Sequence, residues 1–112
     1  MKADKDRLSL VVKKEFFDMI LSGYKKEEYR AITKHWRRLL ENSPNAMFVF
    51  NPRKYKTVQF INGYRKDARR ILLECNGITT GEPNKKWCGT MSDQFEYCYI
   101  IKIGSEISRK NC

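Results

Sequence analysis

The sequence predicts a small α+β domain, built as a mixed but mainly antiparallel β-barrel of about five or six strands with two N-terminal helices. Two observations support this prediction. Apolar residues recur at helical spacing in two segments between residues 13 and 41, and short β-branched or aromatic runs separated by turn signals fill most of the remaining chain. With 112 residues, the chain is large enough for one modest hydrophobic core and too short for two.

The first predicted elements are a strand, a helix and a second strand. Residues 8–12 (LSLVV) are apolar and end on β-branched side chains, which favours a strand. Between residues 13 and 23 (KKEFFDMILSG), apolar side chains fall at i, i+1, i+4 and i+5 on one helical face. Gly23 suits the position just after the end of that helix. Residues 26–32 (KEEYRAI) follow as a strand.

A second helix is predicted from Thr33, whose hydroxyl can cap it, to about Glu41. Its apolar stripe consists of Ile32, Trp36, Leu39 and Leu40. The sequence SPN at 43–45 ends the helix. The run 47–50 (MFVF) fits either a brief strand or a loop, so the role of segment 43–54 stays open.

The C-terminal half is predicted to consist of strands. Residues 56–61 (KTVQFI) form a strand that ends in an Asn-Gly turn at 62–63, and residues 71–75 (ILLEC) form a buried strand. Residues 77–83 are predicted as a turn with room for a short strand. Residues 85–89 (KKWCG) are predicted as a loop.

The clearest strand signal lies at 95–103 (FEYCYIIKI), where the odd positions form one continuous apolar or aromatic face. We expect Gly104 to end this strand. Residues 1–107 are therefore predicted to form a single domain, followed by a frayed C-terminal tail at 108–112.

Targeting signals and cysteine usage predict a cytoplasmic protein. The N-terminus lacks the apolar stretch of a secretory signal, and no apolar run approaches the roughly 20 residues that span a bilayer. The four cysteines, Cys75, Cys88, Cys98 and Cys112, include no CxxC pair, and His35 is the sole histidine. We expect free thiols instead of disulfides, no bound metal and no cofactor.

The charge balance favours a polyanionic partner. The chain carries 23 Lys and Arg against 13 Asp and Glu, a formal net charge of +10. Such a domain attracts RNA or nucleotides by counterion release, although some soluble proteins are basic without such a partner. A membrane is disfavoured because no predicted helix combines a broad apolar face with a uniformly basic one.

A charged motif follows the first helix, with Gly23, Lys25, Glu28 and Arg30 in the sequence GYKKEEYR. On a strand, Glu28 and Arg30 share a face, whereas Lys25 must reach that face from the turn after Gly23 or from a bulge. Such a corner suits a ligand. Arg30 offers planar donors to a phosphate or a base edge, and Glu28 could orient either cation or accept protons from an exocyclic amine. The alternative is a Glu28–Arg30 ion pair on the barrel surface, which contributes little to stability.

The order of strand, helix, glycine and GxKxxExR motif resembles the ASCH domain family, whose fold is similar to the PUA RNA-binding barrel. The resemblance covers about residues 8–107, through the Trp36 helix, the strand ending FINGY (60–64), the tryptophan loop at 87–89 and the strand YCYIIKIG (97–104). The sequence looks most like the small, single-domain members from bacteria and their phages. The resemblance implies a PUA-like fold and RNA binding.

The resemblance also implies an enzymatic alternative. Some single-domain members of the family are amidohydrolases that remove the acyl group from N4-acetylcytidine, and another is a ribonuclease. The catalytic lysine of the amidohydrolases corresponds to Lys25, whereas their motif carries a threonine where this chain has Glu28. In such an enzyme, Lys25 with a lowered pKa would act as general base or nucleophile, and Glu28 would position water. Whether the protein is an enzyme stays open at this point.

Further candidates lie outside the motif. Tyr64, after the Asn-Gly turn, and Trp87, beside two lysines, are suited to stacking on a base, although each also fits a structural role at a loop. Seven basic residues are suited to phosphate contacts or to a solvated surface: Arg53, Lys54, Lys56, Arg65, Lys66, Arg69 and Arg70.

Three hypotheses of function follow. The first is an RNA- or modified-nucleotide-binding domain with a ligand pocket built around Lys25, Glu28 and Arg30. The second is a small hydrolase that acts on an acylated nucleoside or on RNA with Lys25 at its centre. The third is a module that binds another protein.

Overall fold

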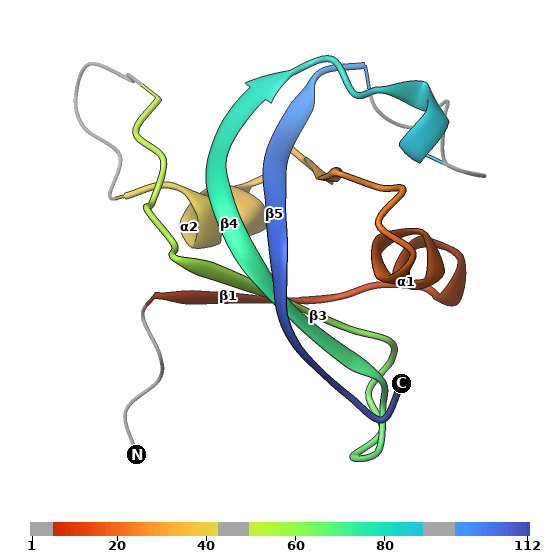
Figure 1. The fold of residues 1–112 in the computed structure, drawn as a ribbon. Coiled ribbons are helices and arrows are strands. Elements are labelled where there is room, and N and C mark those ends of the chain that lie inside the picture. Colours follow the sequence, from red (N-terminus) through yellow and green to blue (C-terminus); the bar gives the residue numbers. More distant parts are fainter. Residues whose placement is uncertain (1–5, 43–49, 89–95) are drawn as a thin grey trace.

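The computed structural model describes residues 6–42, 50–88 and 96–112, which form five strands, two α-helices and one 3-10 turn (Figure 1). In chain order these are β1 (Arg7–Val11), α1 (Lys14–Leu21), β2 (Glu27–Ala31), α2 (Lys34–Leu40), β3 (Thr57–Ile61), β4 (Arg70–Gly81), the 3-10 turn η1 (Lys85–Trp87) and β5 (Cys98–Lys110). Within these residues, no helix is long and apolar enough to cross a membrane.

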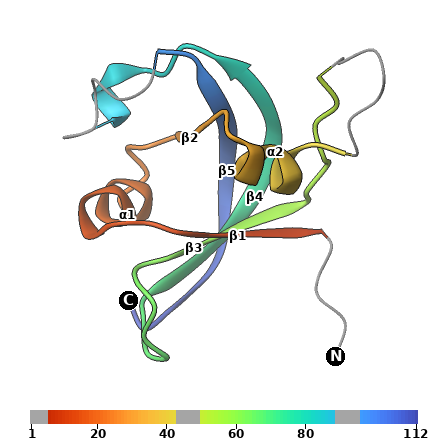
Figure 2. The same ribbon diagram turned by 180° about the vertical axis from the view of Figure 1, so that it is seen from behind.

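The strands form one curled, half-barrel sheet in the order β1-β3-β4-β5-β2. The β1–β3 pair is parallel, and the other three pairs are antiparallel. In both ribbon views, β4 and β5 form a long curved ribbon with η1 near one end and the β3–β4 turn near the other (Figures 1 and 2). The mainly antiparallel pairing is therefore confirmed. The outer strands are β1 and β2, so the sheet is a half-barrel with two edges.

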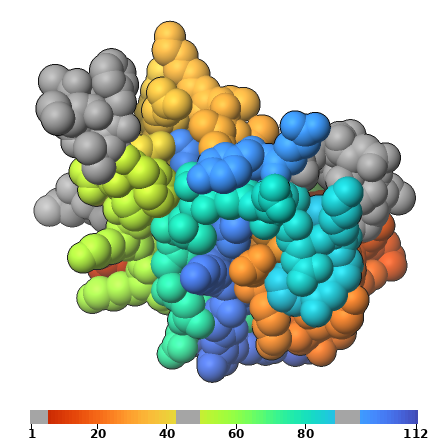
Figure 3. All heavy atoms as spheres, turned by 90° about the horizontal axis from the view of Figure 1, so that it is seen from above, coloured from red at the N-terminus to blue at the C-terminus, as the bar shows by residue number. Residues whose placement is uncertain are grey.

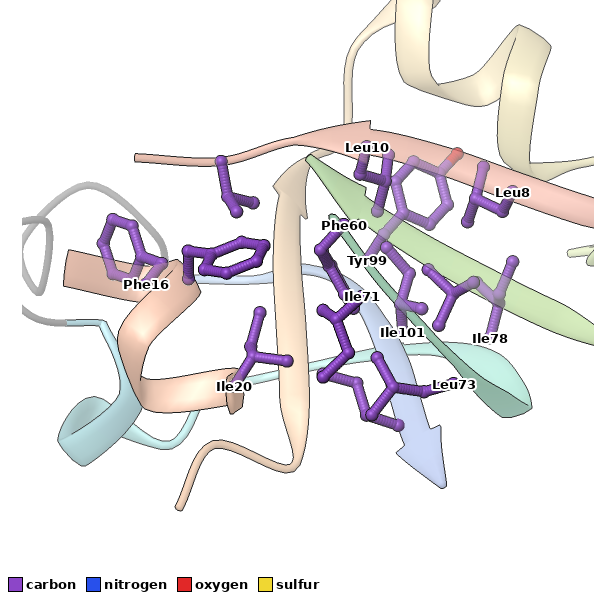
Figure 4. Close-up of a cluster of buried hydrophobic side chains, with 14 of the residues drawn as sticks. Leu8, Leu10, Phe16, Ile20, Phe60, Ile71, Leu73, Ile78, Tyr99 and Ile101 are labelled. Carbon is purple, nitrogen blue, oxygen red and sulfur yellow. The ribbon is translucent and has the colours of Figure 1, made fainter. Parts of the chain in front are cut away.

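The core lies inside the curl of the sheet and is covered by α1 (Figure 4). The helix buries Phe16, Phe17 and Ile20, as its apolar spacing predicts. The strands contribute the largest share of the main cluster: Leu8, Leu10, Val58, Phe60, Ile71, Leu73, Ile78, Tyr99, Ile101 and Ile103. The period-2 alternation of these strands places one face of each in this core.

A second, smaller cluster lies on the other face of β5. It contains Tyr29 of β2, Trp87 and Cys88 at η1, and Cys98 and Ile100 of β5. The first part of β5 is therefore buried on both faces. The predicted apolar face at odd positions is only partly correct, because Tyr97 is 61% exposed and Phe95 lies outside the described residues.

The region after the β3–β4 turn differs from the prediction of a strand at 71–75 and a separate turn, with room for a short strand, at 77–83. The structure has one strand, β4, that continues to Gly81 and pairs with β5 along this length. The register shifts between Leu72 and Ile78, which marks a bulge. Gly77 has a φ of +116° there, a conformation that suits glycine and keeps the strand in the sheet.

The predicted end of the last strand at Gly104 is also wrong. Strand β5 runs to Lys110, so residues 108–110, expected in a frayed tail, pair with β4. A Cβ atom built on Gly104 would lie 2.8 Å from the Asn76 side chain and 3.0 Å from Glu74 Cβ. Glycine is required here because the two strands approach closely beside the bulge. In the sequence, a glycine that allows such an approach looks the same as a glycine that ends a strand.

The helix α2 begins as predicted, since Thr33 Oγ1 accepts a hydrogen bond from the Trp36 backbone N–H at 3.3 Å. Its apolar stripe is less buried than predicted. Leu40 is fully buried, whereas Ile32 and Leu39 are 39% and 38% exposed. Predictions at 43–49 and at 89 lie outside the described residues.

We predict that Gly104→Ala lowers the free energy of unfolding by about 1–3 kcal/mol, because the added methyl group overpacks the contact with Asn76 and Glu74. Chemical denaturation measures this difference. The matched control is Ser105→Ala at the neighbouring exposed position, which we expect to change stability by less than about 0.5 kcal/mol. Equal stability of the two variants would contradict the close approach at Gly104.

Candidate functional site

The charged motif forms a corner between α1 and β2. Gly23 follows the helix with a φ of +82° and donates its backbone N–H to the Ile20 carbonyl, which ends the helix in the way that glycine favours. Lys25 lies in the turn before β2, and Glu28 and Arg30 lie in the strand. The prediction that Lys25 reaches the Glu28–Arg30 face from the turn is therefore confirmed.

Lys25 is almost completely buried, with 1% of its side chain exposed. Its Nζ donates a hydrogen bond to the Trp87 carbonyl oxygen at 2.8 Å and lies 3.4 Å from Glu28 Oε1. The ammonium group also lies 4.8 Å from the centre of the Tyr29 ring and 5.4 Å from that of Phe16. A buried ammonium group requires such partners, because its desolvation is costly.

Glu28 connects Lys25 to Arg30. Its other oxygen, Oε2, accepts a hydrogen bond from Arg30 Nη2 at 2.7 Å. The side chains of Glu28 and Arg30 are 8% and 17% exposed, so this is not the surface ion pair considered from the sequence. Removing one partner from a buried ion pair leaves the other charge uncompensated. The three residues therefore form a continuous buried chain of alternating charge.

Arg30 extends this chain to the opposite edge of the sheet. Its Nη2 also donates to the backbone carbonyl of Val11 at the end of β1, at 3.2 Å. The guanidinium carbon lies 4.8 Å from the centre of the Trp36 ring in α2. Arg30 thus holds together the two outer strands, β1 and β2, and the helix that follows β2.

A pocket of about 360 Å³ lies at this junction. It is lined by Val11, Val12, Lys13, Phe16, Lys25, Glu28, Tyr29, Arg30, Ala31, Trp36, Trp87 and Cys88. The space-filling view shows the segment with η1 (cyan) lying against the segment that leads into β2 (orange) (Figure 3). The Lys25–Trp87 hydrogen bond and a hydrogen bond from the Asn84 N–H to the Tyr29 hydroxyl at 2.9 Å join these segments.

Two buried donors of the pocket walls have no hydrogen-bond partner among the described residues: Arg30 Nε and Trp87 Nε1. Unpaired buried donors cost about 1–3 kcal/mol each. Such groups are uncommon in folded proteins, and both belong to residues that line the pocket.

Burial lowers the pKa of Lys25, because desolvation of its ammonium group outweighs the attraction of the Glu28 carboxylate. Burial also raises the pKa of the Cys88 thiol in the same pocket. Cys88 is therefore protonated at neutral pH. Within the described residues, no group of three or more His, Cys, Asp or Glu side chains is arranged to hold a metal ion.

The structure places the other predicted residues differently. Trp87 lines the pocket and is 9% exposed. Tyr64 is 91% exposed in the β3–β4 turn, at the opposite end of the β4–β5 ribbon from η1, and does not line the pocket (Figures 1 and 2). The prediction that Tyr64 contributes to the same ligand pocket is not supported by this geometry.

The predicted phosphate-binding residues divide into two groups. Arg53 donates to the carbonyl oxygens of Glu41 and Arg38 and so caps the C-terminus of α2. Arg69 pairs with Asp18 at 2.9 Å and stacks on Phe17, so it has a structural role too. Exposed or half-exposed positions are occupied by the remaining five: Lys54, Lys56, Arg65, Lys66 and Arg70.

Helix α2 and the segment that joins β1 to α1 also contribute to the site, and no prediction included them. Trp36, predicted as part of an apolar stripe, lines the pocket and contacts Arg30. Lys13 lines the pocket at the start of α1 and is exposed. Long-range packing brings these residues together, and the only local signal was the alternation of tryptophan with basic residues in KHWRR.

The site thus belongs to a half-barrel whose two edge strands and following helix enclose a partly polar pocket. The fold is similar to that in the crystal structure of a mutant ASCH protein from Zymomonas mobilis, with a TM-score of 0.56 and 13% sequence identity, over 98% of this chain and 77% of the other. No protein-family model and no curated protein matches the sequence. The likeness shows that this chain has an ASCH-like fold, as the sequence resemblance predicted.

We predict that Lys25 makes stability depend on pH in a specific direction. Its pKa is lower in the folded state than the ordinary value of 10.5, so the unfolded chain binds more protons between the two values and the free energy of unfolding rises with pH there. The difference in unfolding free energy, wild type minus Lys25→Met, should therefore shift in favour of wild type as the pH rises toward about 10.5.

Urea denaturation of both proteins from neutral pH upward measures this difference, and other titrating groups largely cancel in the subtraction. A difference that stays constant with pH, or that moves against the wild type, would show that the pKa of Lys25 is not lowered by burial.

Proposed function

We propose that this chain is a member of the ASCH family that binds RNA or a modified nucleotide in the pocket between β1 and β2. The observation that carries the proposal is the joining of Lys25, Glu28 and Arg30 into one buried chain in the wall of a concave site. Buried charges in the wall of a pocket of this size are typical of ligand sites.

The surroundings of the pocket support an anionic ligand. Lys13 lines it, and two further lysines, Lys85 and Lys86, lie exposed on η1. The Nζ of Lys86 lies 4.6 Å from the centre of the Trp87 ring and 5.9 Å from that of Tyr24. Basic side chains interleaved with aromatic rings are suited to the phosphates and bases of a single strand.

A second basic region suits the path of an RNA backbone. Arg65 and Lys66 are exposed in the β3–β4 turn beside Tyr64, and Arg70 pairs in register with Lys110 across β4 and β5. Like charges directly opposite each other destabilise a sheet slightly, and a phosphate would relieve that repulsion. An extended RNA that contacts both regions would lie along the β4–β5 ribbon.

We predict that Arg30→Ala weakens binding of a short single-stranded RNA about tenfold. The substitution removes a positive charge from the pocket wall and leaves Glu28 without its Arg30 partner. Lys86→Ala should weaken binding about threefold, as expected for a phosphate contact. Fluorescence anisotropy at several salt concentrations measures both effects, and affinity should fall steeply as salt rises.

Lys110→Ala, in the second basic region at the far end of the ribbon from η1, should have a smaller effect than Arg30→Ala, because it removes one phosphate contact outside the pocket. Binding that does not respond to salt or to Arg30→Ala would refute the proposed site. Copurification of a second protein that stays bound after nuclease treatment and at high salt would favour a protein-interaction module.

A hydrolase is the second candidate, and the lowered pKa of Lys25 in a pocket favours it. In this reading, neutral Lys25 accepts a proton from water or from the attacking group, and Glu28 and Arg30 hold the substrate. The same lysine is 1% exposed and donates to the Trp87 carbonyl oxygen, so its Nζ must leave that partner before it can react.

We predict, for the hydrolase, release of free acid from an N4-acylcytidine or cleavage of labelled RNA by the purified wild-type protein. Lys25→Met should abolish turnover, whereas Tyr64→Ala, far from the pocket, should retain it. Chromatography of the products measures turnover. No turnover at high protein concentration would remove this candidate and leave binding as the function.

A further inference from the structure

Helix α2 exposes more of its surface than a helix that packs on a core usually does. Among its residues, Leu40 is buried, Trp36 is half-buried and the other five are exposed. In the space-filling view, the α2 segment (yellow-orange) projects from the body of the molecule (Figure 3). Most of its side chains therefore face solvent, and their chemistry decides what this helix contacts.

The solvent-facing side of α2 is cationic. Lys34 lies three positions before Arg37 and four before Arg38, so these exposed side chains are neighbours on one side of the helix. Arg53, also exposed, lies at the C-terminal end of α2, where its guanidinium donates to the carbonyl oxygens of Arg38 and Glu41 at 2.9 and 2.8 Å. We call Lys34, Arg37, Arg38 and Arg53 the α2 basic surface.

The protein neutralises little of this charge. Glu41 lies 3.9 Å from Arg37 Nε, but its carboxylate also accepts a hydrogen bond from the Tyr99 hydroxyl. Within the described residues, neither Lys34 nor Arg38 forms an ion pair. The sequence at 43–49, directly after this helix, contains no Asp or Glu. Like charges three and four positions apart on a helix repel each other, so a bound anion relieves a repulsion in the protein.

The helix that carries this charge is held rigidly. The last carbonyl oxygens of a helix have no partner within it. In α2, the carbonyl oxygens of residues 38–41 all accept from outside the helix: Arg53 donates to three of them at 2.8–2.9 Å, and the Tyr55 hydroxyl to the fourth at 2.7 Å. The Arg30 guanidinium packs on the Trp36 ring from the side of the sheet. A basic surface fixed in this way loses little conformational entropy when it binds.

The α2 basic surface adjoins the pocket. Trp36 lines the pocket, and Arg37 is the next residue along the helix. The other pocket tryptophan, Trp87, comes from η1, which lies apart from α2 in both ribbon views and carries exposed lysines of its own (Figures 1 and 2). A polynucleotide with one nucleotide in the pocket has further phosphates for both elements, whereas a mononucleotide has none to spare.

We propose that the α2 basic surface binds backbone phosphates of an RNA strand whose neighbouring nucleotide occupies the pocket, so that the ligand is a polynucleotide and not a free nucleotide. The inference rests on the proposed function that this pocket binds RNA or a nucleotide, and it narrows the ligand. Lys and Arg contacts to phosphates supply affinity and fix the path of a strand without reading its sequence. An acidic protein matches the charge as well, but RNA also supplies bases for the aromatic pocket beside this surface.

The test removes two charges that have no ion pair among the described residues, in the double variant Lys34→Gln with Arg38→Gln. Glutamine keeps the helix propensity of lysine and arginine, so we expect the fold to persist. Fluorescence anisotropy with a single-stranded RNA of about ten nucleotides measures binding over a range of salt concentrations. We expect about tenfold weaker binding at low salt. The slope of log affinity against log salt should become shallower by about 1.4, or about 0.7 for each lost phosphate contact.

Two matched variants control for the loss of charge and for the change of side chain. Lys26→Gln with Lys102→Gln removes the same charge from exposed positions outside the proposed surfaces, and should change the affinity and the slope much less. Lys34→Arg with Arg38→Lys keeps the charge, and should bind RNA as the wild type does. The wild type should also bind this RNA at least about tenfold more tightly than it binds UMP, and the glutamine variant at α2 should reduce that ratio.

Equal affinities and slopes in the α2 and control glutamine variants overturn the inference, and so does an equal loss in the charge-retaining variant. RNA binding no tighter than UMP binding also overturns it. Poly-glutamate that displaces the RNA at the same salt concentration as readily as unlabelled RNA would assign the surface to an acidic protein instead. If RNA binding still depends on Arg30 while the α2 variant behaves as its control, this inference fails and the proposed function stands. Absence of both RNA and nucleotide binding overturns both.

Discussion

The rest of the site depends on the two ion pairs of the Glu28 carboxylate. Each of its oxygens faces one cation, Lys25 in the turn after α1 and Arg30 in β2. Without it, a lysine that is 1% exposed would lose its only nearby opposite charge among the described residues. Loss of one partner from a buried ion pair typically costs about 3–5 kcal/mol, so the corner is held in place by this carboxylate and not by backbone pairing alone.

Arg30 carries this constraint to the other edge of the half-barrel. The outer strands β1 and β2 are not neighbours in the sheet order, yet the guanidinium group donates to both Glu28 and the Val11 carbonyl oxygen. Side chains therefore span a gap that backbone hydrogen bonds leave open. The space between the edges becomes a pocket, and Trp36 and Trp87 supply its aromatic walls. The same contacts that complete the fold thus also produce the concave site.

Local sequence signals predicted the elements well where a single period or cap determined them. The alternation of a strand placed Glu28 and Arg30 on one face, and Thr33 capped α2 as expected. The sequence signals predicted the wrong structure where one residue type has two structural roles. Gly104 was assigned to a strand end, but it allows close approach of β4 and β5. Tyr64 lies in the β3–β4 turn, at the end of the long β4–β5 ribbon opposite to η1 and the pocket. Only the assembled sheet reveals this separation.

The central claim is that the corner organised by Glu28 holds a nucleotide between the edges of the half-barrel. A crystal structure of the protein with a bound nucleotide tests it most directly. The account predicts that the base lies in the pocket between Trp36 and Trp87, with the phosphate toward Lys13 or the lysines of η1. A base stacked on Tyr64 at the β3–β4 turn, with the pocket unoccupied and the Lys25–Glu28–Arg30 chain unchanged, would contradict it.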